Sequence, residues 1–235
     1  YLQTEGSHSH SSTADPSEYE YFFAQTLAEA EHVIHITATA DLSGAYPNAT
    51  QAAKTFDNVT VVDSCHISSG HGLMVLCAAM LAEEGKSPVE ICQALGEYRE
   101  RIFSSFLVSG TATLHRNGKV SGGVNRLCTL LDLHPILSMS KNRLKLWRIE
   151  SGNMHRAVRQ YIKMLFKHSR QIDTRVLFIT YAGCTVKQID EIARIVEKYI
   201  HFDKVILQKA SATVSSNCGI GTFGLMFARK EKQEP

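Results

Sequence analysis

Short clusters of hydroxyl side chains stand at the ends of apolar segments, where they have the chemistry to bind an anion. Residues 37–46, with the sequence TATADLSGAY, follow a β-branched run and lead into a stretch of helical periodicity. A hydroxyl beside the exposed N–H groups of a helix start suits a carboxylate or a phosphate, and Ser43 has this position. The alternative is plain capping of the helix by Ser43 or Asp41. Similar clusters recur at residues 13–17, 63–70 and 215–219, which favours one shared polar pocket.

A glycine-rich run at residues 219–224, GIGTFG, has the spacing of a dinucleotide-binding loop. That interpretation needs a helix that opens on the run and an acidic residue about 20 positions later. Only eleven residues follow the run, and they are typical of a strand. We therefore favour a tight turn that brings backbone N–H groups close to a ligand.

Neither catalysis nor metal binding has a complete residue set in this sequence. An acyl or phosphate hydrolase that uses Ser43 with His66 or His71 lacks both a nucleophile elbow and an acidic third member. The eleven histidines are scattered without the spacing of metal ligands, which favours core or solvated histidines. The six cysteines stand singly and are typical of reduced core residues. We therefore expect no catalytic group, no metal and no cofactor.

Charge and hydropathy argue against two classes of partner. The formal net charge is +2, which gives no general reason to bind nucleic acid or an anionic membrane. The longest apolar run, residues 72–82, is shorter than the roughly 18 residues of a membrane span, and the first residues lack the apolar stretch of a signal peptide. We expect a cytoplasmic protein. A basic stretch at residues 141–175 suits phosphate or a partner protein, but its helical spacing favours a solvated helix face.

The apolar periodicity predicts an α/β protein of two lobes, residues 1–109 and 110–235, each a mainly parallel sheet flanked by helices. The first helix is expected after Pro16, with Ser17 as its cap. The expected helices cover residues 17–31, 43–56, 69–84, 87–102, 122–132, 152–169 and 185–199. The expected strands cover residues 33–37, 58–62, 104–108, 135–139, 144–148, 176–180, 205–207 and 225–228, with a hairpin turn at 140–143.

Six motifs resemble, in order, those of the DegV family of bacterial fatty-acid-binding proteins. TADPS at residues 13–17 resembles the family's Thr-Ser-x-Pro-Ser, and TADLSGAY at 39–46 resembles Ser-Ser-x-Leu-Ser-Gly-Thr-Tyr. Residues 63–72 resemble the family's Asp-Ser/Thr…Ser-x-Gly-x-Gly, and residues 114–121 resemble Leu-x-x-Gly-Gly-Arg-Ile-Ser. Residues 130–137 resemble Leu-Leu-x-x-Lys-Pro-Ile-Leu, and residues 217–222 resemble His-x-Gly-Pro-Gly-Thr. One such match is weak, but six in order are strong.

The resemblance implies a long-chain fatty acid in a tunnel between the lobes, with its carboxylate held by hydroxyls of the first two motifs. Carried over to this sequence, Thr13 and Ser43 are the first candidates and Thr39 is the second. The implied ligand-binding set is completed by Gly44, Asn217, Gly219, Gly221 and Thr222. By resemblance the protein is a carrier without catalysis of its own, which presents the bound acid to a separate kinase for acyl-phosphate formation. Lys119 and Arg148 are expected to contact that partner.

Several positions depart from the family motifs and thin the expected polar pocket. Three alanines replace hydroxyls, and Lys119, His134 and Asn217 stand where the family has arginine, lysine and histidine. Asn217 can donate a hydrogen bond to a carboxylate but does not titrate near pH 7. The family's opening strand and its first acidic-hydroxyl motif have no counterpart, so we expect a first lobe that lacks a strand or receives one from a partner segment. These departures keep open an alternative, a ligand-poor interaction or sensor module of the same fold. The three alanines are Ala14, Ala40 and Ala45.

Overall fold

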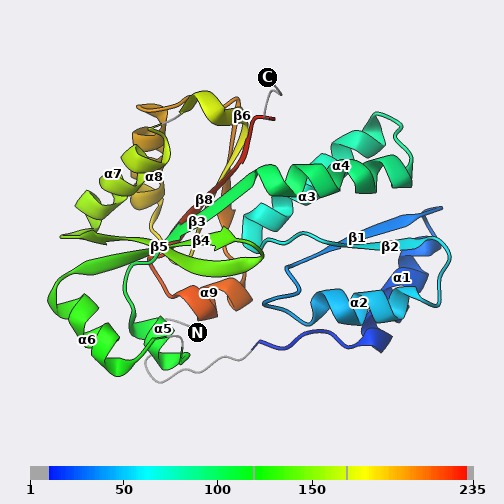
Figure 1. The fold of residues 1–235 in the computed structure, drawn as a ribbon, viewed down its shortest axis with the longest axis horizontal. Coiled ribbons are helices and arrows are strands. Elements are labelled where there is room, and N and C mark those ends of the chain that lie inside the picture. The colour runs from blue at the N-terminus through cyan, green and yellow to red at the C-terminus, as the bar shows by residue number, and fades with distance from the viewer. Residues whose placement is uncertain (1–10, 119, 168, 232–235) are drawn as a thin grey trace. The chain divides into compact units, whose positions relative to one another are not determined.

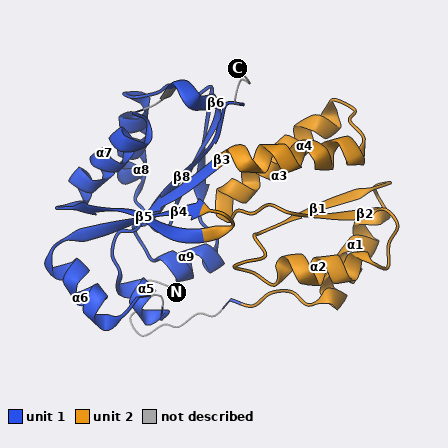
Figure 2. Ribbon diagram, viewed as in Figure 1, with its two compact units in different colours: residues 1–11, 103–139, 144–235 blue, residues 12–102, 140–143 orange. Residues whose placement is uncertain are grey.

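The computed structural model describes residues 11–118, 120–167 and 169–231, and the chain divides into two compact units (Figure 2). Unit 2 comprises Ser12–Ile102 and Ser140–Arg143, and unit 1 comprises Phe103–Met139 and Leu144–Pro235 with Tyr1–Ser11. This division differs from the boundary expected after residue 109. The reason is that β3 (Ile102–Leu107) is a strand of the larger sheet, which lies in unit 1.

Unit 2 is a two-stranded parallel sheet with four helices (Figure 1). Strands β1 (Val33–Thr37) and β2 (Val59–Asp63) pair in register from Val33 opposite Val59 to Thr37 opposite Asp63. Because the strands are parallel, their carboxyl ends meet at the same edge of the sheet, where the hydroxyl clusters follow. The helices are α1 (Pro16–Leu27), α2 (Ala45–Ala53), α3 (Ser68–Glu83) and α4 (Pro88–Arg101).

Helix α1 begins with Asp15 as its cap, so the expectation of Ser17 is wrong. The Asp15 carboxylate accepts hydrogen bonds from the backbone N–H groups of Ser17 and Glu18, at 2.9 and 3.1 Å. Glu18 completes a capping box, because its carboxylate accepts from the Asp15 N–H at 2.8 Å. Pro16 explains the difference: its fixed φ suits the first helical position, so the residue before it becomes the cap.

One face of β1 packs against α1 and α2. Val33 lies in a buried cluster with Phe23 of α1 and Ala49 and Ala52 of α2. His35, two residues further on, places its ring 5.2 Å from the Phe23 ring centroid. Side chains two apart on a strand point to the same side, so Val33 and His35 define the face of β1 that these helices cover.

Unit 1 is built on a six-stranded sheet in the order β5-β4-β3-β8-β6-β7. Strands β3 and β4 are antiparallel, β6 and β8 are antiparallel, and β6 and β7 are parallel. The sheet is therefore mixed in direction. Its core contains apolar side chains of β3, β6 and β8 and of the helices α7 (Met154–Leu165) and α8 (Val186–Glu197). Both helices lie beside this sheet (Figure 1). The further strands are β4 (Leu133–Ser140), β5 (Arg143–Ser151), β6 (Ile172–Tyr181), β7 (Lys204–Lys209) and β8 (Phe223–Arg229).

The helices of unit 1 include two short ones that the periodicity did not predict, α5 (Ala112–Arg116) and α9 (Ala212–Cys218). The others are α6 (Gly122–Leu130), α7 (Met154–Leu165), α8 (Val186–Glu197) and a 3-10 turn at Ser169–Gln171. The α/β class and the expected hairpin are confirmed. Lys141 and Asn142 have φ values of 49° and 64°, which is the geometry of a two-residue hairpin loop with the twist that suits adjacent strands.

Candidate functional site

The first two hydroxyl motifs come together at the start of α2. A Cβ added at Gly44 would lie 3.5 Å from Thr13 Oγ1, so the Thr13 side chain rests against the Gly44 backbone. The Asn48 amide donates to the Ala14 carbonyl at 2.7 Å and fastens this segment along the first turns of α2. Thr13 and Gly44, which are 31 positions apart in the sequence, are thereby neighbours, and their sharing of one ligand pocket with Ser43 stays a prediction.

Ser43 precedes Gly44, the N-cap residue of α2, and its hydroxyl binds the first N–H group of the helix. Its Oγ accepts a hydrogen bond from the Ala45 N–H at 3.1 Å. A hydroxyl can accept and donate at the same time, so capping leaves the O–H available to a carboxylate. The first N–H groups of α2 have no partner within the helix and carry its positive dipole end. Capping and anion binding are therefore compatible at Ser43.

Thr39 has a structural role in this conformation. Its side chain is fully buried, and Oγ1 donates to the Asn142 carbonyl at 3.2 Å. Its own carbonyl accepts from the Ser43 N–H at 3.1 Å, which holds the turn that leads to α2. A threonine has a single hydroxyl proton, so Thr39 positions the turn and its proton is engaged by Asn142.

Asp63 ties together the segments that follow β1 and β2. Its two carboxylate oxygens accept hydrogen bonds from the backbone N–H groups of Ala40, at 3.2 Å, and Cys65, at 2.8 Å. Because Asp63 ends β2 and Ala40 lies in the turn after β1, one side chain fixes both loops. This is the role of the aspartate in the third motif in this structure.

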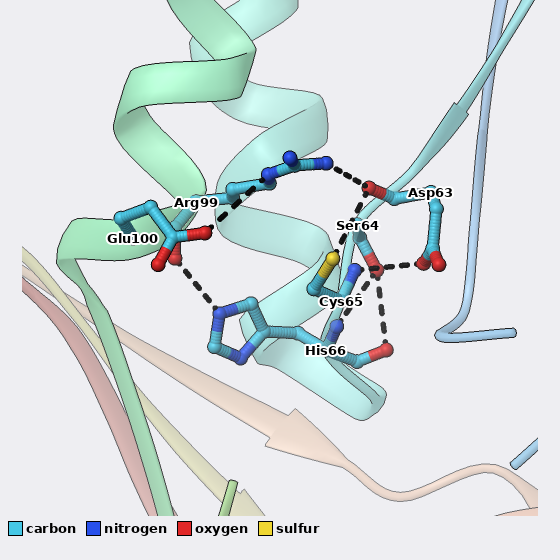
Figure 3. Close-up of polar contacts among 6 residues, drawn as sticks. All are labelled: Asp63, Ser64, Cys65, His66, Arg99 and Glu100. Carbon is cyan, nitrogen blue, oxygen red and sulfur yellow. Dashed lines mark hydrogen bonds and ion pairs between the residues drawn. The ribbon is translucent and has the colours of Figure 1, made fainter. Parts of the chain in front are cut away.

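A polar network around residues 63–66 braces the same edge (Figure 3). Ser64 Oγ donates to the His66 carbonyl at 3.1 Å, and the His66 ring contacts the Arg99 carbonyl at 3.0 Å (Figure 3). Arg99 in turn donates to the Asp63 carbonyl at 3.5 Å. Burial, assisted by the Asp63 charge, raises the pKa of the Cys65 thiol. Cys65 therefore stays protonated at neutral pH and is a structural residue.

The histidines proposed for a hydrolase are engaged by carbonyl oxygens. Nε2 of His66 faces the Arg99 carbonyl, and Nε2 of His71 lies 2.8 Å from the Ile36 carbonyl. Burial lowers the pKa of both rings, so each is neutral at pH 7 and carries its proton on Nε2 to donate to that carbonyl. These bonds orient both rings toward the backbone, whereas the Ser43 hydroxyl bonds to Ala45.

The glycine run in unit 1 forms a tight loop between α9 and β8. Gly219 and Gly221 have φ values of 84° and 83°, which favour glycine. A Cβ at Gly219 would lie 2.7 Å from Thr113 Oγ1, and one at Gly221 would lie 3.0 Å from Ser109 Cβ. The loop leads into a strand, so it lacks the helix of a dinucleotide-binding turn.

The remaining expected ligand residues of unit 1 bond within the loop. Asn217 is exposed, and its amide donates to the Thr213 carbonyl in its own helix at 2.8 Å. Thr222 is buried, and its hydroxyl donates to the Cys218 carbonyl at 3.0 Å. Thr222 therefore braces the loop, and Asn217 caps a helical turn in this conformation.

Of the two cations expected to contact a partner, Arg148 lies among the described residues. Arg148 lies on β5 with Nε 2.7 Å from the Glu150 carboxylate. Lys119 lies outside the described residues. His134, which stands for the family's lysine, is buried, and its ring nitrogens contact the carbonyls of Ser109 and Gly152 at 3.1 and 2.9 Å.

One polar residue at the strand edge belongs to the first hydroxyl cluster but is not among the ligand residues expected from the sequence. Thr37 ends β1 and is only 3% exposed, yet among the described residues its Oγ1 has no hydrogen-bond partner. The signal was present in the alternation of β1, because Thr37 falls on the same face as Val33 and His35. A threonine at the end of such a face places a hydroxyl where an apolar side chain would be expected.

The structure describes residues 11–118, 120–167 and 169–231, and two kinds of feature are absent from them. These residues contain no group of three histidine, cysteine, aspartate or glutamate side chains placed to hold a metal ion. Over the same ranges no helix combines the length and apolar character that crossing a bilayer requires.

The chain was found similar to one protein family over nearly its whole length. The family model described as "Uncharacterised protein, DegV family" matches residues 1–230. A DegV domain-containing protein of Deinococcus radiodurans is 28% identical over 220 residues, which are 91% of this chain and 76% of the relative. Its match and that of the family model extend over both units.

Two solved structures share the fold over most of their length. A DegV family protein from Thermus thermophilus, described by its fatty acid binding, is 27% identical with a TM-score of 0.80 and covers 93% of this chain and 78% of its own. The Streptococcus pneumoniae fatty acid kinase (Fak) B3 protein, loaded with linoleic acid, is 20% identical with a TM-score of 0.78, and the shares covered are 93% and 78%.

Proposed function

This chain belongs to the DegV family, and we propose that it binds one long-chain fatty acid non-covalently, without catalysis of its own. The observation that carries the proposal is the convergence of Thr13, Ser43 and Gly44 at the first turn of α2. The fatty acid binding described for the Thermus thermophilus relative supports the same ligand class.

The start of α2 suits a carboxylate better than a neutral head group. Ser43 has a free hydroxyl proton, Thr13 adds a second hydroxyl, and the helix start adds N–H groups and a positive dipole end. Hydrogen bonds from neutral donors to an ionised acceptor are roughly twice as strong as those between neutral groups. Two or three such donors hold a carboxylate without a buried cation.

The acyl chain supplies most of the expected binding energy. Burial of a chain of ~16 carbons contributes roughly 0.8 kcal/mol per methylene, or about 12 kcal/mol before the cost of ordering the chain and the protein. Head-group contacts then select an acid over an alcohol or ester. In this proposal Asn217, Gly219, Gly221 and Thr222 remain predicted ligand residues, carried over from the family motifs.

Presentation of the acid to a kinase is the finer part of the proposal. The pneumococcal neighbour is named as a fatty acid kinase B3 protein, which supports a role beside such an enzyme. Lys119 and Arg148 are the predicted partner contacts, and a cytoplasmic location belongs to the same proposal. Addition of a fatty acid kinase and ATP to the loaded protein should yield an acyl phosphate.

A second candidate function follows from side-chain donors that already form hydrogen bonds within the protein. Thr39 gives its hydroxyl proton to Asn142, and Asn217 gives an amide proton to Thr213. A site with fewer available donors favours the alternative of a ligand-poor interaction or sensor module.

Native mass spectrometry of freshly purified and delipidated protein separates the two candidates. The carrier is expected to retain one fatty acid on purification and to rebind one equivalent of hexadecanoate after delipidation. The added mass should disappear on denaturation, because the complex is non-covalent. A protein that stays at its bare mass with hexadecanoate present contradicts the carrier and supports the module.

A further inference from the structure

The hydroxyl of Thr37 is buried without a partner at the site where the carboxylate is proposed to bind. Thr37 is 3% exposed, and its Oγ1 meets no acceptor or donor among the described residues. A buried polar group without a hydrogen bond costs about 1–3 kcal/mol, so native proteins rarely keep one. The hydroxyl therefore calls for a partner that the described residues do not provide.

The direction of the Thr37 side chain follows from the strand. Val33 packs against Phe23 and Ala49, and the His35 ring contacts the rings of Tyr19 and Phe23, at 5.4 and 5.2 Å. Alternation along β1 places Thr37 on the same face, toward α1 and α2.

Along that face, Thr37 lies at the end of β1 that leads to the start of α2. Residue 37 ends β1, and the chain then turns through residues 38–44 into α2. The turn is tight, because the Ser43 N–H donates to the Thr39 carbonyl at 3.1 Å. A helix that follows its strand through a short loop has its N-terminus at the carboxyl end of that strand. Thr37 is therefore directed toward the end of α2 that Ser43 caps.

Two independent features thus converge on an anion site, a helix N-terminus with a hydroxyl cap and a buried hydroxyl without a partner. We propose that Thr37 Oγ1 is a further head-group residue, which donates a hydrogen bond to the carboxylate and selects the acid over uncharged lipids. This inference rests on the proposed fatty-acid binding and adds a residue to its site. Within the described part of the chain, Thr37 Oγ1 has no partner to release before it binds a ligand, whereas Thr39 would first have to release Asn142.

Valine in place of Thr37 separates ligand binding from stability. Valine has nearly the shape of threonine and removes only the hydroxyl, so the ligand-free T37V protein should unfold at the same or a higher denaturant concentration. Its dissociation constant for hexadecanoate should rise about tenfold, while that for hexadecan-1-ol changes little. T37S, which keeps the hydroxyl, should retain the wild-type preference for the acid.

Thr50 provides the matched control. Its Oγ1 is also buried without a partner among the residues described, but it lies six residues beyond Gly44, about 9 Å along the helix axis. T50V should raise or maintain the unfolding midpoint and leave the affinity for hexadecanoate unchanged.

The outcomes distinguish failure of this inference from failure of the proposed function. Wild-type affinity in T37V overturns the role of Thr37 while the carrier function stands. An equal loss of affinity for the acid and the alcohol, or a lowered unfolding midpoint of ligand-free T37V, also overturns it, because either shows a structural role. A wild-type protein that does not bind hexadecanoate overturns both.

Discussion

Ser43 shows how one hydroxyl can serve the fold and a ligand together. Its lone pair accepts the Ala45 N–H, which satisfies a donor at the helix start, and its proton remains for a carboxylate. From the sequence alone, capping and anion binding are alternatives for this hydroxyl. At this residue they are two halves of the same geometry.

Replacement of Ser43 by alanine should weaken fatty-acid binding by about 1–3 kcal/mol, because part of a buried carboxylate loses its donor. Isothermal titration of hexadecanoate into the wild-type and S43A proteins measures this difference. Ser121 is the control, since its Oγ also caps a helix by accepting the Val124 N–H, at 3.3 Å. S121A should lose stability like S43A but keep its affinity, and an unchanged affinity in S43A would remove Ser43 from the site.

The sequence predicted the meeting of Thr13 with the Ser43 segment but not the engagement of Thr39. The first follows from the recurrence of hydroxyl motifs along the sequence and from the family resemblance. The second depends on Asn142, which lies 103 positions away at the tip of a hairpin. A contact of that range has no local signal, so the choice among the three hydroxyls needed the structure.

At the scale of elements, β-branched runs predicted the strands well, whereas the short helices were not predicted. Val33–Thr37 was predicted at its observed bounds because a run of five residues, four of them β-branched, has no competing helical period. Helices α5 and α9 have only five and seven residues, less than two full turns, and show no amphipathic period. The strand order of unit 1 depends on β8 lying between β3 and β6, which only tertiary pairing decides.

The glycine loop is the element whose conformation depends most on one residue type. Gly219 combines a positive φ with the close approach of Thr113, so alanine there adds both backbone strain and a steric clash. We expect Gly219→Ala to lower the free energy of unfolding by about 1–3 kcal/mol more than the same substitution does at a glycine that has only the positive φ.

Gly118 is that comparison. Its φ is 68°, it lies in the same unit, and a Cβ there would meet nothing within 4 Å. Urea denaturation of Gly118→Ala and Gly219→Ala measures the two costs under the same conditions. Equal losses would mean that the Thr113 side chain moves aside, and the loop would then not be held by this contact.

At the scale of the whole molecule, the described histidines whose pKa is lowered by burial lie in one unit. His35, His66 and His71 all lie in unit 2, and burial lowers the pKa of each ring. The His35 and His71 rings are also close enough for each charge to disfavour the other, which lowers the pKa of His35 further. Unit 2 should therefore be the acid-sensitive part of the chain.

The sign of the pH dependence follows from these pKa values. Below the ordinary histidine pKa of 6.5 the unfolded chain takes up protons that the folded unit resists. The stability is fully present above pH 6.5 and falls as the pH drops through the lowered folded values. Each histidine contributes at most about 1.4 kcal/mol per pH unit, and less for the half-buried His35.

His35→Phe tests this dependence, because the ring sits among the aromatic rings of Tyr19, Phe22 and Phe23 and phenylalanine fits such surroundings. Between pH 7.5 and 5, its free energy of unfolding should fall less than that of the wild type. His201 is the control: its hydrogen bond to Glu197 raises its pKa, so His201→Gln removes a contribution of opposite sign and should not reduce the loss of stability at low pH.

Far-UV circular dichroism follows both units, whereas Trp147 fluorescence follows unit 1. At pH 5 the dichroism should therefore begin to change at a lower denaturant concentration than the fluorescence. Two results together would show that unit 2 does not carry the acid sensitivity: coincident transitions of the two signals, and a free energy of unfolding that falls with pH in His35→Phe as it does in the wild type.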